Sequence, residues 1–430
     1  MSPYESQIIR LLKSLLLNPA DMAERASDQF FPGKQSGFRV PYGMVMNWWY
    51  SPDTFFARDD VAALAIQSSP DFKNCDHETV ASVVMDAARE RCMDGALFHT
   101  DQVAFRGRAT LFECSKAHPK ELANTLCDTI ASNLREKIGR RCTLHAAPRF
   151  TVPSFQLETA GVRVIARNDE EAWQSLVDEG FEFDGWTPQR PVLKNRSDAT
   201  FSPPIEFQMI LVSDDIGTAA GSRFDAVLRF RKLTAVLHAI ASRDLAYRIH
   251  KAAAVPWGFL VQFPHQTLGE RSIGRNDTDP LLPYFASDID VSVAQTAEIA
   301  KWYSDAACCE QQHQDRIDKA ANFLNRGLNA KDVESFINYF VTLDALFGQR
   351  GSVESSILEG VRALDLGSDF DQKADWLFEL RNELVHGGSR YIAEWPKHGR
   401  YTQHFRTKPA DDVRQLAELA VLGAPQLFSK

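Results

Sequence analysis

The hydrophobic period changes along the chain, and this change constrains the fold more than any other feature. Residues 1–95 carry apolar side chains mainly at helical spacing, as at Ile8, Leu12 and Leu16. From 96 to 290, short β-branched and aromatic runs alternate with helical stretches. From 291 onward every periodic segment is helical. The pattern predicts an α+β protein in which a helical and mixed α/β N-terminal region precedes an all-α bundle.

The length of 430 residues predicts two or three domains rather than one. We expect a mainly helical segment over 1–95, an α+β domain over 96–290 and a helical domain over 291–430. A polar, turn-rich stretch at 269–283 is the expected linker between the last two. The α+β domain has the size of an independent sensing or regulatory module.

The charge of the chain excludes a general polyanion-binding protein. It has 48 Lys and Arg against 57 Asp and Glu, a net charge of −9, so contact with nucleic acid requires a local basic patch. The seven cysteines form no CxxC pair, which predicts reduced and mostly buried thiols in a cytoplasmic protein. We expect neither a signal peptide nor a membrane span, because the apolar stretches are short.

Searches for familiar catalytic patterns leave few candidates. The chain has no GxGxxG, P-loop, GxSxG or HExxH pattern, so we expect no cofactor and no metal. The acidic pairs at 214/215, 277/279 and 288/290 are an alternative site for a divalent cation, although such pairs are common in loops. For the paired Trp48 and Trp49, core packing is favoured over base stacking. A basic helical stretch at 223–251, which contains His238, is interpreted as a solvated helix face, with RNA contact as the alternative.

Six helices are predicted in the C-terminal region. Asp332 is the expected N-cap of the third, and Gly348 should end it. Ser368 begins the fifth in a capping-box-like pattern, and this helix should end at the glycine pair 387–388. The expected ranges are 294–307, 315–328, 331–346, 352–364, 368–386 and 410–427.

An R-x4-H pattern, from Arg381 to His386, lies at the end of the predicted fifth helix. Five residues at about 100° each place these two side chains about 140° apart, so they converge poorly within one chain. Asn382 is four residues from His386 and shares its face, so it is expected to orient the imidazole or contact phosphate. Two helix ends that meet across a two-fold axis would bring Arg381 and His386 together.

The stretches before this pattern carry further features. An acidic residue, Asp344, lies in the run 343–348, and a polar residue directly follows Arg381. The stretches concerned are 316–320 with Phe323 and Leu328, 336–348, Val361 with Leu364, and 380–387. Together they resemble the Apea-like branch of the HEPN superfamily over about the last third of the chain.

The resemblance implies a HEPN-like helical bundle that acts as a metal-independent endoribonuclease and as a homodimer. Such proteins are often toxins or effectors of abortive infection and antiviral defence. Arg381, Asn382 and His386 would be the catalytic residues. The 2′-hydroxyl of RNA attacks the adjacent phosphorus, His386 transfers a proton near neutral pH, and Arg381 binds the phosphate oxygens. The expected products carry a 2′,3′-cyclic phosphate and a 5′-hydroxyl.

The segment 387–408 forms a local basic patch. It has five Lys and Arg against one acid, Glu394, with aromatic side chains between them. This combination is typical of single-stranded RNA binding, and a surface loop held by its aromatic side chains is the alternative. The residues expected to bind RNA are Arg390, Tyr391, Lys397, Arg400, Tyr401 and Arg406.

Two other interpretations stay open. In one, a catalytically silent HEPN module serves as a dimerisation or partner-binding scaffold, although the chain keeps both Arg381 and His386. In the other, the chain is the toxin of a toxin–antitoxin pair, although its length exceeds that of a minimal toxin. We expect a gated enzyme, in which residues 1–290 and an unidentified trigger or partner control residues 291–430. An RNase without such control would degrade the cell's own RNA.

Overall fold

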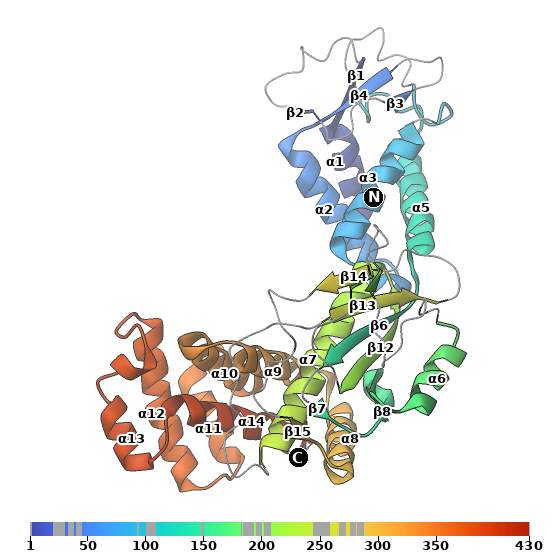
Figure 1. Ribbon diagram of the computed structural model, residues 1–430. Coiled ribbons are helices and arrows are strands. Elements are labelled where there is room, and N and C mark those ends of the chain that lie inside the picture. The colour runs from blue at the N-terminus through green and yellow to red at the C-terminus, as the bar shows by residue number, and fades with distance from the viewer. Residues whose placement is uncertain are drawn as a thin grey trace. The chain divides into compact units, whose positions relative to one another are not determined.

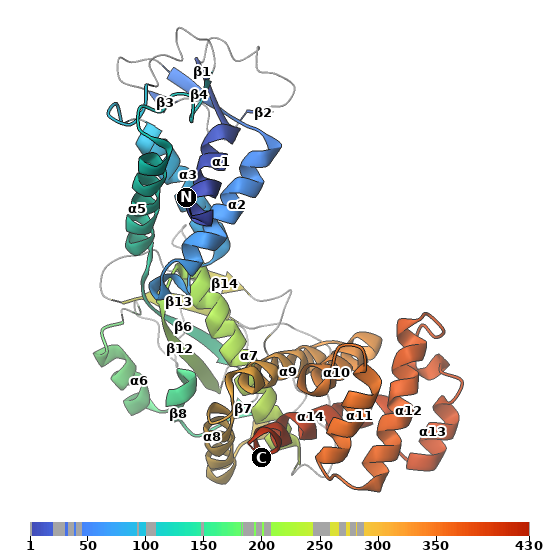
Figure 2. The ribbon, with the colours of Figure 1, turned by 180° about the vertical axis from the view of Figure 1, so that it is seen from behind.

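The structure is a computed structural model, shown from two sides in Figures 1 and 2. It describes residues 2–19, 31–32, 38–39, 45–92, 94–99, 109–147, 150–181, 183, 193–194, 200–201, 208–243, 259–265, 272–275, 281 and 288–429. The chain divides into two compact units. The first comprises Met1–Arg141 and Ile216–Ser222, and the second comprises Cys142–Asp215 and Arg223–Lys430. These boundaries differ from the expected breaks at residues 95 and 290.

The first unit packs helices on a small antiparallel sheet. Its helices are α1 (Pro3–Ser14), α2 (Pro52–Gln67), η2 (Pro70–Phe72), α3 (His77–Cys92) and α5 (Pro119–Lys137). Its strands are β1 (Leu15–Pro19), β2 (Phe31–Pro32), β3 (Phe38–Arg39), β4 (Val45–Tyr50) and β5 (Ala109–Thr110). The strand order is β2-β4-β1-β5, with β3 beside β4.

The first helix shows how local sequence begins this unit. Ser2 and Glu5 form a reciprocal capping box at the start of α1, with hydrogen bonds of 3.2 and 2.6 Å. The helix leads directly into β1, where Leu17 pairs with Trp48 of β4. Trp48 and Trp49 are only 2 % and 8 % exposed. The prediction that this tryptophan pair packs in a core is therefore confirmed.

The short segment Ile216–Ser222 belongs to the first unit through polar contacts with the start of α3. The Thr218 hydroxyl donates to Asp76 over 2.7 Å, and the Asp76 amide donates back to Thr218 over 3.1 Å. A Cβ atom at Gly221 would lie 2.1 Å from the Asn74 carbonyl oxygen. This close approach of two backbones requires glycine.

The second unit contains a larger sheet with the order β14-β13-β6-β12-β9-β8. These strands are β6 (Gly139–Ala147), β8 (Phe155–Leu157), β9 (Val162–Ala166), β12 (Met209–Gly217), β13 (Phe259–Pro264) and β14 (Ser272–Arg275). Two small pairs accompany it: β7 (Phe150–Thr151) with β15 (Ile289–Asp290), and β10 (Leu193–Lys194) with β11 (Thr200–Phe201). A short 3-10 helix, η4 (Glu158–Ala160), joins β8 to β9.

Helices cover both faces of this sheet (Figure 1). Along β12, Met209 and Leu211 join the core that contains Phe230 of α7 (Ala219–Arg243). Ile210 and Val212 join a separate core that includes α6 (Glu170–Asp178). The alternation follows from the two-residue period of a strand that is buried on both faces.

The C-terminal region is helical, as predicted. It consists of α8 (Val293–Ala307), α9 (Gln311–Asn329), α10 (Asp332–Phe347), α11 (Val353–Ala363), α12 (Ser368–Val385), η5 (Ile392–Glu394), α13 (His398–Phe405) and α14 (Pro409–Phe428). The six predicted helices are present. Asp332 is the first residue of α10 rather than its cap, since Lys331 holds that position. Helix α13, within the segment expected to be a loop, was not predicted.

Helix α7 joins the large sheet to the C-terminal helices. One continuous core contains Leu211 of β12, Phe230 of α7, Ile317 of α9 and Val421 of α14. Buried polar contacts reinforce it: Arg231 donates to Asn325 over 2.6 Å, and His238 lies 3.1 Å from Glu418. Interpreting α7 as a solvated face was therefore wrong, because His238 is 2 % exposed. The shared core also explains why no unit boundary falls near residue 290.

Several sequence predictions lie wholly or partly outside the described residues. These are residues 244–251 of the basic stretch, most of the linker at 269–283 and the pair 277/279. Five of the seven cysteines are buried, which confirms the expectation that most of the thiols are buried. Among the described helices, none combines the length and the apolar character needed to cross a membrane.

Candidate active site

The predicted motif lies at the end of α12, and the geometry of this end exposes His386. His386 is the C-cap residue, and Gly387 follows with a φ of +78°. The amide of Gly388 donates to the Glu383 carbonyl over 2.9 Å, which completes a Schellman turn. The predicted stop at the glycine pair is therefore confirmed. The turn leaves the His386 imidazole in solvent.

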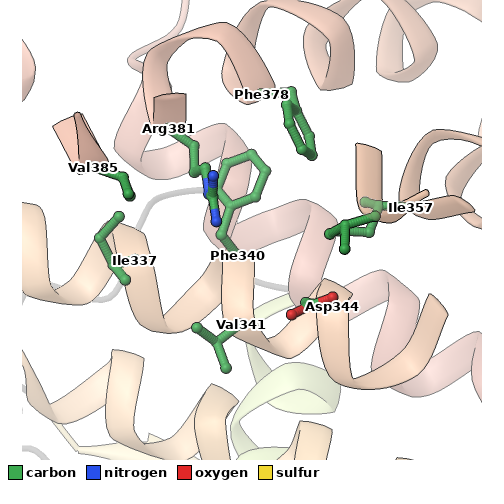
Figure 3. Close-up of a pocket in the computed structure, with 9 residues that line it drawn as sticks. Ile337, Phe340, Val341, Asp344, Ile357, Phe378, Arg381 and Val385 are labelled. Carbon is green, nitrogen blue, oxygen red and sulfur yellow. The ribbon is translucent and has the colours of Figure 1, made fainter. Parts of the chain in front are cut away.

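Arg381 points in a different direction from His386. Its Nη1 donates to the Asn382 side-chain oxygen over 3.0 Å, and its guanidinium lies 5.9 Å from the ring centre of Phe378. The side chain enters a hollow between α10, α11 and α12 (Figure 3). His386 does not line this hollow. Two side chains that are five residues apart on a helix are expected to point about 140° apart, so the different directions of Arg381 and His386 agree with helix geometry.

The hollow is small, with a cavity volume of about 60 Å³. Its two charged lining residues are Arg381 from α12 and Asp344 from α10. No ion pair joins them in the part of the chain that the structure describes. The remaining walls are apolar and are formed by Ile337, Phe340, Val341, Val353, Ile357, Phe378 and Val385.

Asp344 is a site residue that the R-x4-H pattern alone does not indicate. It shares one face of α10 with Ile337 and Val341, at seven- and three-residue spacing. Phe378, Arg381 and Val385 repeat this pattern on α12. A charged residue within each of two facing apolar stripes was the available sequence signal.

The expected contact between Asn382 and the His386 imidazole is not formed. The Asn382 side-chain oxygen accepts from Arg381, and only the backbone carbonyl of Asn382 accepts from the His386 amide, over 3.0 Å. No hydrogen bond joins the two side chains among the described residues. Arg381 and Asn382 thus form one group, and His386 stands apart from both.

Tyr401, one of the predicted RNA-binding residues, is corrected by its burial. It is 0 % exposed, so no base can stack on its ring. Its hydroxyl donates to Asp412 of α14 over 2.9 Å, and burial raises the pKa of this tyrosine far above its usual value. Its ring packs against Trp395, Trp376 and Phe405. The alternative of a segment held in place by its aromatic side chains therefore applies to Tyr401.

The other five predicted RNA-binding residues are exposed. Arg390 pairs with Glu394 over 2.7 Å, and Lys397 pairs with Glu379 over 2.6 Å. The Arg390 guanidinium holds the pKa of Glu394 below its usual value. Arg400 lies over the ring of Trp376, at 5.4 Å. Tyr391 is 55 % exposed and Arg406 is exposed, so both side chains are accessible to a ligand.

Helix α13 is attached to its neighbours by a buried charged cluster. Lys373 of α12 lies 3.3 Å from Asp412 and 2.9 Å from Asp369. Asp412, which is 1 % exposed, also accepts from Tyr401 and Thr407. The cluster holds the basic segment against α12 and α14.

The described acidic pairs give little support to a cation site. Asp215 is paired with Arg229 over 2.7 Å, and burial raises its pKa despite this cation. In the described part of the chain, no three His, Cys, Asp or Glu side chains gather in a way that would hold a metal ion. The end of α12 can instead supply proton transfer by an imidazole and charge stabilisation by a guanidinium. Comparisons of the chain with known protein families, with curated proteins and with solved structures find no match.

Proposed function

We propose that this protein is a metal-independent endoribonuclease of HEPN type whose helical region, α8 to α14, forms a HEPN-like bundle. The observation that carries the proposal is the exposed His386 at the end of α12, one turn after the fixed pair of Arg381 and Asn382. An imidazole in solvent can exchange protons near neutral pH. A guanidinium carries a permanent charge that suits phosphate oxygens.

The reaction uses groups that RNA and these residues provide. His386 takes the proton of the 2′-hydroxyl while its oxygen attacks the adjacent phosphorus. The bond from phosphorus to the 5′-oxygen breaks, and the leaving oxygen takes up a proton. Arg381 stabilises the charge that develops on the phosphate. The products are a 2′,3′-cyclic phosphate and a 5′-hydroxyl, and the reaction requires no metal as nucleophile or Lewis acid.

The proposed site is completed by a second copy of the chain. Arg381 and His386 diverge around α12, so one chain alone does not present both to one phosphate. A two-fold axis near the end of α12 would place His386 of the partner subunit across from Arg381. This arrangement supports the proposed homodimer.

The RNA strand is proposed to run along the exposed cations that follow α12. Arg390, Lys397, Arg400 and Arg406 are exposed, and exposed ion pairs with glutamates are weak enough to exchange for phosphate. We further propose a gated effector of antiviral defence or of a toxin system, controlled by a trigger or partner at the N-terminal part of the chain. Control is needed because such a site has little means of choosing a sequence.

A non-catalytic scaffold is the second candidate function. The observation that favours it is the direction of Arg381, which is held by Asn382 and Phe378 over an apolar hollow. In that case the hollow and the end of α12 would serve only to bind a partner.

An RNA-cleavage assay with the full chain separates the two candidates. We expect His386→Ala to lower the rate by about 100- to 10,000-fold and Arg381→Ala by about 100- to 1,000-fold. His77→Ala, at an exposed histidine of the first unit, is the control and should keep full activity. Excess EDTA should leave cleavage unchanged. Full activity of both α12 variants would favour the scaffold. So would the absence of RNA cleavage by the native chain, both with and without the trigger proposed to act on its N-terminal part.

A further inference from the structure

Helix α13 lies beside α12 (Figure 1), and its exposed surface carries an imidazole, His404, in an aromatic setting. We propose that one unpaired base of the bound RNA stacks on the outer face of this ring. We call His404, with Trp376 of α12 beneath it, the stacking platform. The inference rests on the proposed function and deepens it, because it says why the bound strand must be single. His404 takes no part in the R-x4-H chemistry, so its surroundings are a separate observation.

Three distances between ring centres place the neighbours of His404 on one side of its imidazole. The imidazole is parallel to the Trp376 ring within 2°, at 6.2 Å, and meets the Phe405 ring at a right angle, at 4.6 Å. The rings of Trp376 and Phe405 are only 5.9 Å apart. Two rings on opposite faces of the imidazole would be much farther from each other. Because His404 is also exposed, its outer face is open to a ligand.

The platform is fixed from below by a buried aromatic cluster. Trp376 meets Trp395 and Tyr401 edge to face, at 6.2 and 6.0 Å. Trp395 and Tyr401 are 3 % and 0 % exposed, so the tryptophan beneath His404 has rigid neighbours. A ring that is already held in place loses little conformational freedom when a flat ligand stacks on it. Bases of single-stranded nucleic acids bind to aromatic side chains in this way.

Cations beside the platform indicate which flat ligand it suits. Arg400 precedes His404 by four residues on the same face of α13, is exposed and lies over Trp376 at 5.4 Å. Arg406 is exposed and follows His404 by two residues. Neither arginine forms an ion pair with an acidic side chain of the described residues. Their charges are available to phosphates on either side of a stacked base, so the expected ligand is a nucleotide strand.

Stacking on His404 also restricts the form of RNA that can bind. In a duplex, neighbouring base pairs cover both faces of each base, so no ring is offered to the imidazole. An unpaired base offers a face whatever its identity, because every base has a π face. We therefore expect a clear preference for single-stranded over duplex RNA and only a weak preference among the four bases.

The platform is tested with a single-stranded 2′-O-methyl RNA octamer and the full chain, by fluorescence anisotropy. The methyl group blocks the attacking hydroxyl, so the strand can bind without being cut. We expect His404→Ala to weaken binding by about 5- to 150-fold, the usual contribution of one base stacked on an aromatic ring. His404→Phe keeps a flat ring without charge and should retain most of the affinity. His398→Ala removes an imidazole from the first turn of the same helix and is the matched control.

An octamer without bases distinguishes stacking from contacts with the backbone of the strand. The native chain should bind this abasic strand more weakly than the intact one. In His404→Ala the difference between the two strands should be much smaller, because the variant lacks the ring on which a base stacks. The duplex form of the octamer should bind to the native chain no better than the abasic strand does.

The outcomes separate this inference from the proposed function. Native affinity in His404→Ala, equal binding of octamer and duplex, or no binding of the octamer by the native chain would overturn the platform, and cleavage of RNA by that chain would leave the ribonuclease intact. A loss in His404→Phe as large as in His404→Ala would also overturn stacking, because charge or a ring nitrogen would then be what binds. Binding that depends on the ring of His404, in a chain that cleaves no RNA, would support the platform and refute the nuclease.

Discussion

At the residue scale, Gly387 sets the position of His386. Its φ of +78° lies in the left-handed region, which costs other residues about 1–2 kcal/mol. We expect Gly387→Ala to lower the free energy of unfolding by about that amount in urea titrations. Gly399→Ala is the matched control, because a Cβ atom added at this helical glycine would meet nothing within 4 Å and alanine suits a helix. A larger loss in Gly399→Ala than in Gly387→Ala would contradict the assignment.

The two aspartates around Lys373 provide a second residue-scale prediction. Asp412 is buried and bonded to Tyr401 and Thr407, whereas the Asp369 side chain is 65 % exposed. Asp412→Ala leaves a buried ammonium and a buried hydroxyl without this partner, so we expect a loss of about 3–5 kcal/mol. Asp369→Ala should cost at most about 1 kcal/mol, because its ion pair is screened by water. Thermal and urea unfolding of both variants would check this, and equal losses would contradict the buried role.

At the element scale, Asp76 links α3 to the segment Ile216–Ser222. Burial acts to raise its pKa, but hydrogen bonds from Thr79 and Thr218 outweigh burial and hold the pKa below its usual value. Its carboxylate therefore stabilises the fold above the unfolded-state pKa of ~3.9, and this contribution is lost as the pH falls through the lower folded-state value. Asp76→Asn should lower the free energy of unfolding by about 1 kcal/mol at neutral pH.

The pH dependence of this variant is the decisive measurement. Urea unfolding between neutral pH and about pH 3 should show a difference from the native chain that shrinks with acidity. Asp71→Asn, at an exposed aspartate of η2, should match the native chain throughout. A constant difference at all pH values would mean that the charge of Asp76 is not what stabilises α3.

Helix α13 carries the second element-scale prediction. Arg400 and Arg406 are exposed on and just after this helix, and the proposed strand of RNA passes over them. The double variant Arg400→Glu/Arg406→Glu should bind single-stranded RNA more weakly, with a smaller dependence of affinity on salt. Gln403→Glu adds a carboxylate at an exposed position of the same helix without removing an arginine, and is the control for the added glutamate side chains. Binding that is equal in all three proteins would reduce α13 to a structural element.

At the scale of the whole molecule, the shared core determines which fragments can fold. The faces of α8, α9 and α14 bury Ile299, Ile317 and Val421 in the same core as Phe230 of α7. A fragment of residues 291–430 would expose these faces to water. We expect it to bind a hydrophobic dye and to melt without a sharp transition, as partly packed states do. The fragment 142–430 retains α7 and the sheet and should melt cooperatively.

The same core bears on the proposed control of the enzyme. A switch at residue 290 would have to separate α7 from the C-terminal helices and expose their buried polar contacts, Arg231 with Asn325 and His238 with Glu418. The first unit, by contrast, has a core of its own. If residues 1–141 restrain the nuclease, the fragment 142–430 should be more toxic to a host than the full chain, and His386→Ala should remove this toxicity.

The shared core itself is tested by the melting of the fragment 291–430. A cooperative, sharp melting transition of this fragment would contradict the shared core.

The sequence by itself determined the positions of six C-terminal helices but not that of α13. Apolar spacing placed all six predicted helices, and the glycine pair placed the end of α12 to within one residue. These signals are local, since a helix and its cap depend on residues within one or two turns. The divergence of Arg381 and His386 follows from the same local geometry.

Only the tertiary structure decided what each side chain faces. Tyr401 carries the same sequence signal as Tyr391, yet Trp376 and Asp412 bury it while Tyr391 stays exposed. Asp344 and Arg381 line one hollow although 37 positions separate them in the sequence. Helix α7 likewise joins the sheet and the bundle in one core, because segments that are distant in the sequence pack against it. Burial depends on which distant segments pack together, and the local hydrophobic period does not contain that information.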